Sequence, residues 1–379
     1  MIADPQLHGG VQDRQQLQTD RLMPWLRGVL PSSFDGALLV RKFAGGQSNP
    51  TYCLETNVGA FVLRKKPQGA LLASAHAIDR EYRVMHALAG TAVPVPSLLG
   101  YCEDEAVLGT AFYLMRYVPG RMLGERTIAQ GSVKARQATY LDMVQVLGVI
   151  HALDWQALGL ADFGRPDRYM QRQVERWTRQ LELSLTADWP AMRSLSEWLS
   201  GRLPVEARTS LVHGDYRLGN VLIDPELPRV RAVLDWELST IGHPFADLGY
   251  YCISYELPSE FGGCQDLDLE VHGIPSRAQV LAHYAAHCGA GFSDANAACD
   301  LDMFVVFSMF RLAAIGAGVY RRAMDGNAAD DRAMSHWRRY QYIGEAAWRL
   351  AQAIEWGDTP RARSPASLDP IHINTKTSA

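Results

Sequence analysis

Short apolar runs separated by polar turns follow residue 34. Leu38–Phe43, Thr51–Glu55 and Ala60–Lys65 have the length and the aliphatic and aromatic content of β-strands. Residues 44–49, which include two glycines, and the turn Asn57-Val58-Gly59 separate them. The pattern predicts a strand-rich N-terminal region.

Helical periodicity appears next and dominates the second half of the chain. His76–Ala89 carries apolar residues three or four positions apart, which is the spacing of one helix face. Two more strands are expected at Leu98–Cys102 and Ala111–Arg116. Ala135–Leu153 has the same helical spacing, and Met303–Tyr320 is apolar on all sides. A helix of the second kind is expected to be buried.

The last of these strands runs into Pro119-Gly120, a natural break between two bodies. We therefore predict an α+β fold with a small β-rich N-lobe at 35–118 and a larger, mainly helical C-lobe at 119–362. Residues 1–34 would form an arm and a short helix, and residues 363–379 a polar, disordered tail.

Composition narrows the class of protein. The chain has 379 residues, is 47% hydrophobic and has a formal net charge of -4. This is a globular composition without the basic excess of a nucleic-acid-binding protein. The six cysteines include no CxxC pair, and no signal pattern is present. We expect a cytoplasmic protein without membrane or nucleic-acid partners, and the oligomeric state stays open.

A polar loop between two apolar runs carries the clearest chemical signal. Asp215 is followed five residues later by Asn220, and a further apolar run ends at Asp235. This spacing is typical of a kinase catalytic loop, in which the Asp takes the proton of a hydroxyl and the other two groups hold Mg²⁺. Asp215 is thus a candidate base, and Asn220 and Asp235 are candidate metal ligands.

Neighbouring polar residues have less certain roles. Arg217 could reach the phosphoryl group in transfer, and His213 is expected to fix the loop. Glu237 either extends the metal site or is a plain loop charge. Asp247 either caps a helix or binds the backbone of the catalytic loop, and the two roles are compatible.

The N-lobe offers the parts of a nucleotide site. Gly45 and Gly46 would let backbone N–H groups approach phosphate oxygens, with Ser48 and Asn49 as polar contacts. A simple hairpin turn explains the same glycines. We expect ATP as the phosphoryl donor, with Mg²⁺.

A phosphate-binding cation is expected on the third strand. Arg64 is the first choice and Lys66 the second, although both could be solvated edge charges. Glu81 lies on the apolar face of the following helix, where a carboxylate needs a partner. The sequence therefore predicts an Arg64–Glu81 ion pair, unless Glu81 reaches water at the edge of that face.

The strand before Pro119 would form the hinge and the adenine pocket. Met115 would back the pocket, and the carbonyl of Arg116 and the N–H of Val118 would contact the adenine edge. Asp162-Phe163-Gly164 spells a kinase magnesium motif but precedes the catalytic loop. We interpret it as a turn.

These motifs together resemble the aminoglycoside phosphotransferase and choline kinase-like branch of the protein-kinase-like fold. His213-Gly214-Asp215 with Asn220 matches this branch, and Asp235-Trp236-Glu237 replaces the Asp-Phe-Gly of protein kinases. The resemblance covers roughly residues 35–350. It implies a bilobal fold, ATP, Mg²⁺ and a small hydroxylated substrate.

Two N-lobe segments, Phe61–Pro67 and Ser74–Tyr82, are similar to the kinase-like modules fused to some acyl-CoA dehydrogenases. That similarity favours a metabolic kinase acting on a hydroxyacyl compound. One late helix carries Arg311, Arg321 and Arg322, and these cations favour an anionic or acyl substrate. The acid-rich residues 256–302 favour a cationic acceptor, as in an antibiotic phosphotransferase. A non-catalytic, nucleotide-binding pseudokinase is the remaining alternative. Absence of an Ala-Pro-Glu segment argues against a protein kinase.

Overall fold

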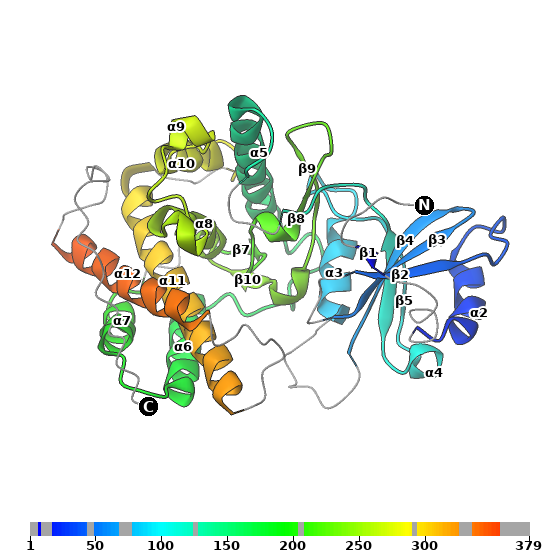
Figure 1. The fold of residues 1–379 in the computed structure, drawn as a ribbon, viewed down its shortest axis with the longest axis horizontal. Helices are drawn as coiled ribbons and strands as arrows, with labels where there is room; N and C mark the ends of the chain where they lie inside the picture. The colour runs from blue at the N-terminus through cyan, green and yellow to red at the C-terminus, as the bar shows by residue number, and fades with distance from the viewer. Residues whose placement is uncertain are drawn as a thin grey trace.

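The chain folds into two lobes, a sheet-based N-lobe and a helical C-lobe (Figure 1). The computed structural model describes residues 7–8, 17–43, 49–67, 78–123, 128–203, 208–289, 294–325 and 336–356. The predicted bilobal α+β fold is confirmed.

One antiparallel sheet forms the N-lobe, in the strand order β1-β2-β3-β4-β6-β5. The central strands β3, β4 and β6 carry runs of buried residues, because both faces of the sheet are covered. The strands are β1 (Leu7–His8), β2 (Leu39–Phe43), β3 (Thr51–Thr56), β4 (Gly59–Lys65), β5 (Leu98–Cys102) and β6 (Phe112–Arg116).

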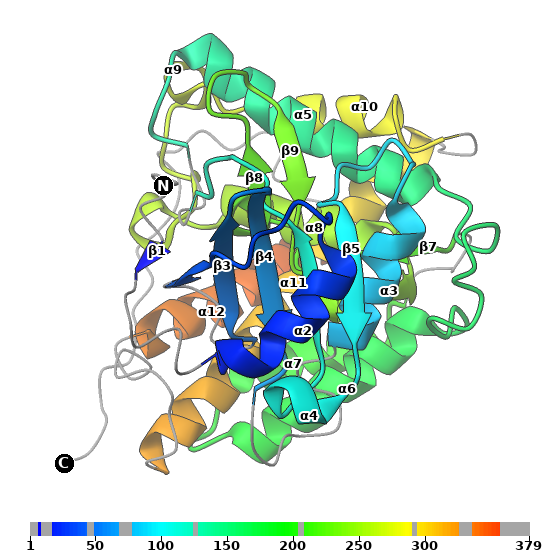
Figure 2. The same ribbon diagram turned by 90° about the vertical axis from the view of Figure 1, so that its right-hand side faces the viewer.

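Helices cover both faces of this sheet. Helix α2 (Thr19–Val29) lies across the face seen in Figure 2 and buries Leu22 and Leu26. Helix α3 (Ile78–Leu88) packs on the other side, where its apolar stripe is buried. A short helix, α4 (Glu105–Leu108), links β5 to β6.

The C-lobe is built around one long helix, α11 (Asp294–Met324), which packs against α6, α8 and α12. Its residues 300–324 are long and apolar enough to cross a membrane, but 72% of the tested window is buried inside the protein. The predicted buried helix is therefore confirmed, with longer bounds. The other helices are α5 (Val133–Ala152), α6 (Tyr169–Ser184), α7 (Pro190–Ser200), α8 (Phe245–Cys252), α9 (Leu269–His272), α10 (Arg277–Ala285) and α12 (Trp337–Glu355).

Two small antiparallel strand pairs lie where the C-lobe meets the N-lobe. β7 (Ser210–Val212) pairs with β10 (Thr240–Gly242), and β8 (Val221–Ile223) pairs with β9 (Val230–Val233). Short 3₁₀ turns, Leu218–Asn220 and Trp236–Leu238, precede β8 and β10. The predicted catalytic loop therefore connects β7 to β8. Each of these strands is hydrogen-bonded to a partner strand, which fixes both ends of the loop.

Candidate active site

Gly214 gives the polar loop its sharp turn after β7. Its φ is +86°, and a Cβ atom there would lie 2.6 Å from the carbonyl oxygen of Leu238. Glycine alone tolerates both the left-handed backbone and this close approach. The turn brings Asp215 back toward the lobe interface.

Asp215 and Asn220 are in direct contact. The Nδ2 of Asn220 donates to the Oδ2 of Asp215 (2.7 Å) and to its backbone carbonyl (2.8 Å). Arg217 Nε donates to the same Oδ2 at 3.2 Å. The Asp215 side chain keeps 19% of its surface exposed, so that a ligand can still reach it.

Asp247 binds the backbone at the start of the catalytic loop. Its two oxygens accept the backbone N–H groups of His213 (2.6 Å) and Gly214 (2.8 Å). His151 Nε2 lies 3.3 Å from the same buried carboxylate. Burial would raise the pKa of Asp247, but the hydrogen bonds and the nearby histidines outweigh it and lower that pKa. Of its two predicted roles, binding the loop backbone is the observed one.

Two further contacts complete the anchoring of the loop. His213 Nε2 is 2.9 Å from the carbonyl oxygen of Leu234, so this histidine fixes the loop as expected. Arg311 Nη2 donates to the carbonyl of Gly214 at 2.7 Å. Since this guanidinium supports the loop, it no longer argues for an anionic substrate.

Arg64 lies among three carboxylates across the lobe interface. Its Nε is 2.9 Å from Glu81 Oε2, and its Nη2 lies 2.6 Å from Asp235 Oδ1 and 3.8 Å from Glu237 Oε2. The predicted Arg64–Glu81 ion pair is therefore present, and Glu81 is buried. The backbone N–H of Leu234 donates to the carbonyl of Asn220 (2.8 Å), so Asp235 lies beside the catalytic loop.

This cluster has fewer cations than anions. Burial raises the pKa of Glu81 to about 7, against the lowering influence of Arg64. Burial also disfavours a charged Arg64, but the surrounding carboxylates outweigh it and raise the Arg64 pKa. One guanidinium shared among three acids explains why both shifts are upward. The arginine stays charged at all relevant pH values.

The remaining predicted nucleotide contacts are only partly visible. Gly45, Gly46 and Ser48 lie outside the described residues, whereas Asn49 is fully buried and donates to Glu237 Oε2 at 2.8 Å. Lys66 follows the end of β4 and is exposed.

The predicted hinge borders β8. Met115 is buried, Arg116 is exposed and Val118 is partly buried. A Cβ atom at Gly120 would lie only 2.9 Å from Cβ of Leu222, so the chain crosses closely over β8 after the hinge. Leu222 was not predicted as a site residue, although it lies in the apolar run directly after Asn220.

Asp162-Phe163-Gly164 is a turn, as interpreted from the sequence. The Asp162 side chain is 77% exposed and pairs with Arg83. Phe163 is buried under Arg80, whose guanidinium carbon lies 3.9 Å from the ring centroid. This segment therefore holds helix α3 and lies apart from the metal-ligand candidates.

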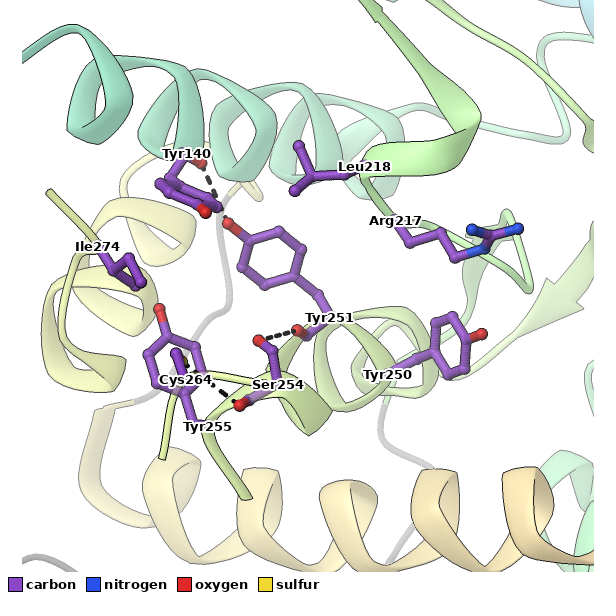
Figure 3. A pocket seen from close by; sticks show the side chains of 9 residues that line it. All are labelled: Tyr140, Arg217, Leu218, Tyr250, Tyr251, Ser254, Tyr255, Cys264 and Ile274. Atoms are coloured by element: carbon purple, nitrogen blue, oxygen red, sulfur yellow. Dashed lines mark hydrogen bonds between the residues drawn. The ribbon is translucent and has the colours of Figure 1, made fainter. Parts of the chain in front are cut away.

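A small pocket, partly open to solvent, adjoins Arg217 (Figure 3). Four of its nine lining residues are tyrosines. Sequence reasoning missed this pocket because no spacing links residues from α5, α8 and the following turns. Tyr251 donates to the carbonyl of Tyr140 (3.3 Å), and Tyr255 donates to the carbonyl of Pro275 (2.6 Å), so these rings are held in place. The lining residues are Tyr140, Arg217, Leu218, Tyr250, Tyr251, Ser254, Tyr255, Cys264 and Ile274.

Four carboxylates of the acid-rich segment have structural partners. Arg277 pairs with Glu256 (3.0 Å) and with Asp302, and all three are at least partly buried. Asp266 accepts hydrogen bonds from Ser259, and Asp268 caps α9. These four carboxylates therefore have structural roles, and the alternative of a cationic acceptor stays open.

Comparison with known proteins agrees with this geometry. A sequence profile of the phosphotransferase enzyme family matches residues 39–284. The mouse (Mus musculus) protein acyl-CoA dehydrogenase family member 10 is 42% identical over 344 residues, which are 90% of this chain but 32% of that protein. The chain thus spans about a third of that relative's length.

Solved structures show the same fold. A Ralstonia eutropha protein provisionally named an aminoglycoside phosphotransferase has 43% identity and a TM-score of 0.79, covering 88% of this chain and 98% of its own. Plasmodium vivax ethanolamine kinase matches at 11% identity and a TM-score of 0.60, with 92% and 90% coverage, which supports the fold alone. With the family profile and the catalytic-loop geometry in agreement, this chain belongs to the phosphotransferase enzyme family and is a phosphotransferase.

Proposed function

We propose that this protein transfers the γ-phosphoryl group of ATP, in the presence of Mg²⁺, to the hydroxyl group of a small metabolite. The observation that carries the proposal is the contact of Asp215 with Asn220, beside the Arg64–Asp235 ion pair. Phosphoryl transfer requires mainly positioning and charge neutralisation, and these four residues supply both.

Asp215 would orient the acceptor hydroxyl and take its proton. Asn220 keeps its amide nitrogen on Asp215, which leaves the amide oxygen to face the phosphates. Arg217, which contacts Asp215 and lines the pocket, would hold the phosphoryl group as charge develops.

The donor set suits Mg²⁺. No group of three or more His, Cys, Asp or Glu able to hold a metal occurs in the described parts of the chain. Mg²⁺ in phosphotransferases typically takes one or two protein oxygens together with substrate phosphates, and Asn220 with Asp235 provides such oxygens. When bound, the ion would neutralise phosphate charge.

The Tyr-lined pocket is the proposed acceptor site, since Arg217 belongs both to it and to the catalytic loop. Its described lining residues include no Asp or Glu, so it lacks the carboxylates that a polycationic aminoglycoside would need. Aromatic and aliphatic walls instead suit an acyl chain. We favour a hydroxyacyl compound, and the dehydrogenase names of the relatives agree with this choice.

Transfer of label from γ-labelled ATP to a library of hydroxylated metabolites tests the proposal. Hydroxyacyl acceptors should be labelled in a Mg²⁺-dependent way, and GTP in parallel would establish the donor. Labelling of aminoglycosides instead would overturn the acceptor assignment. Tight nucleotide binding without transfer to any acceptor would revive the pseudokinase alternative.

A further inference from the structure

One side-chain hydrogen bond links the two lobes next to the metal-ligand candidates. Asn49 Nδ2 donates to Glu237 Oε2 at 2.8 Å, over 188 residues of sequence. Asn49 lies just before β3 and Glu237 lies in the turn after Asp235. The pair therefore joins the N-lobe loop that precedes β3 to the C-lobe segment that carries Asp235.

Asn49 is rigidly held. It is fully buried, and its backbone carbonyl accepts the Thr51 hydroxyl at 2.9 Å. The next residue, Pro50, accepts the backbone N–H of Lys65 at 3.0 Å. Asn49 Oδ1 is buried and has no hydrogen-bond partner among the described residues. The bond to Glu237 is then the contact that orients this amide.

Glu237 is equally constrained. It follows Trp236, which is fully buried and donates its indole N–H to the carbonyl of Val233 at 3.1 Å. Glu237 Oε2, the atom that accepts from Asn49, also lies 3.8 Å from Arg64 Nη2. One carboxylate oxygen thus serves both the N-lobe amide and the N-lobe cation.

We propose that Asn49 and Glu237 are positioning residues that latch the start of β3 in the N-lobe to the Asp235 segment. The latch fixes Asn49, a predicted nucleotide contact, relative to the metal-ligand candidates before chemistry begins. Glu237 would then act through Asn49 and Arg64, and its charge would be less important than its acceptor oxygen. This inference rests on the proposed function, because it concerns the same nucleotide site.

A double-mutant cycle on purified full-length protein tests the latch itself. Asn49→Ala, Glu237→Ala and the double variant would be unfolded in urea without nucleotide. If the bond exists in solution, the two single effects are coupled and the double variant loses less stability than their sum. Additive losses would overturn the latch. Asn57→Ala, an exposed asparagine in the β3–β4 turn, is the matched control.

Nucleotide titrations test whether the Asn49–Glu237 latch supports ATP binding. Asn49→Ala and Glu237→Ala should each weaken ATP binding about tenfold, as expected for losing one hydrogen bond to a charged group, and the double variant no further. Glu237→Gln keeps an acceptor oxygen and should stay within about threefold of wild type, with an unchanged Mg²⁺ requirement.

Two results would overturn the positioning role. Glu237→Gln could raise the Mg²⁺ requirement while Asn49→Ala leaves it unchanged, which would make Glu237 a metal ligand. Alternatively, the wild type could bind ATP while Asn49→Ala binds it equally well. Wild-type protein that binds no nucleotide at all would instead refute the proposed function, on which the inference depends.

Discussion

At Gly214 the backbone has a φ of +86°, and at Gly90 it has nearly the same value, +84°. The two glycines differ in their surroundings, because a Cβ atom at Gly90 meets nothing within 4 Å and one at Gly214 lies 2.6 Å from a carbonyl oxygen. Substitution of the two glycines by alanine therefore distinguishes two effects: the strain of a left-handed backbone, which both share, and the steric clash with Leu238, which only Gly214 has.

Gly90→Ala should lose roughly 1–2 kcal/mol of unfolding free energy through its left-handed backbone alone. Gly214→Ala should lose more, because the Leu238 carbonyl must move as well, and its phosphoryl transfer should fall at least tenfold. Urea unfolding and a transfer assay measure both effects. Equal losses in stability with full activity in both variants would contradict the crowding at Gly214.

Asp215→Ala should reduce phosphoryl transfer at least about a hundredfold, since it removes a contact that is strengthened in the transition state (~2.7 kcal/mol). ATP binding should change less than the transfer rate, because Asp215 contacts Arg217 and the amide nitrogen of Asn220 rather than Arg64 in the described structure. Single-turnover rates and nucleotide titrations together distinguish this outcome. Loss of both properties would mean a structural role.

His243 provides a pH-dependent contribution to stability. Burial, together with repulsion from His151 and Arg208, lowers its pKa to about 4. Its Nδ1 accepts the backbone N–H of Phe245 at 3.2 Å, so the neutral ring is the form that fits. An unfolded chain protonates this group below about pH 6.5, whereas the folded chain does so only near 4.

Stability should therefore fall as the pH drops from about 6.5 to about 4, by up to about 3 kcal/mol at roughly 1.36 kcal/mol per pH unit. His243→Asn keeps an acceptor atom but does not titrate, so its stability should fall less over this range. Urea unfolding at several pH values measures the difference. Parallel curves for both proteins would refute the assignment.

A contact was predictable from the sequence where a buried charged side chain requires an oppositely charged side chain as its partner. Glu81 lies on an apolar helix face, and its demand for a cation led to Arg64 from sequence alone. Arg311 was not predictable, because its partner is the backbone carbonyl of Gly214, 97 residues away. Every residue has a backbone carbonyl, so the residue type does not indicate which carbonyl accepts a hydrogen bond.

At the scale of elements, helix α3 is held to the C-lobe by an arginine that precedes Glu81. Arg80 donates to the carbonyls of Phe163 (2.8 Å) and Ser239 (3.2 Å) and stacks on the Phe163 ring. Both partners belong to the C-lobe, so this residue fixes the helix that presents Glu81 to Arg64.

Arg80→Ala should lose about 1–3 kcal/mol of unfolding free energy, because two buried carbonyls lose a charged donor, and ATP binding should weaken as Glu81 shifts. Arg83→Ala is the matched control on the same helix. Its partners, the Asp162 carboxylate and the Gly159 carbonyl, are exposed, so this variant should lose much less stability than Arg80→Ala. Thermal unfolding and nucleotide titration test both, and similar behaviour of the two variants would contradict the clamp.

Helices and strands were predictable because periodicity is a local property. Strands β2 to β6 and α3 appear within a few residues of their expected bounds, whereas β1 (Leu7–His8) lies in the part that was expected to be a loose arm. The Tyr-lined pocket was not predictable, since its walls meet only after α5, α8 and a turn pack together. The partners of the acid-rich segment were not predictable for a similar reason, because Arg277 pairs with carboxylates on two separate elements.

At the scale of the whole molecule, the two lobes do not have separate cores. On one face of the N-lobe sheet, Val62 and Met115 belong to the hydrophobic core that continues through the C-lobe. On the other face, Leu63 and Leu114 pack with Leu26 of α2 in a second, smaller core. One sheet therefore serves both cores.

This sharing predicts a single thermal transition, in which calorimetric and van't Hoff enthalpies agree. Leu26 is fully buried in the smaller core, so Leu26→Ala should lose about 2–5 kcal/mol of unfolding free energy. The melting temperature of the single transition should fall accordingly. Leu183→Ala, at a site that is 73% exposed, is the control and should have little effect. A separate early transition in Leu26→Ala would contradict the shared sheet.

Most residues that line the Tyr-lined pocket come from one short stretch of the chain. Tyr250, Tyr251, Ser254, Tyr255, Cys264 and Ile274 all come from residues 250–274, whereas Asp215, Asn220 and Asp235 precede this segment. Most of the wall of the proposed acceptor site thus comes from one stretch of sequence, whereas Arg217 and Leu218 come from the catalytic loop and Tyr140 from α5. Acceptor choice could therefore diversify by exchange of one short cassette, with the catalytic loop left intact, and grafting that cassette between related enzymes is a direct route to redesigned kinases.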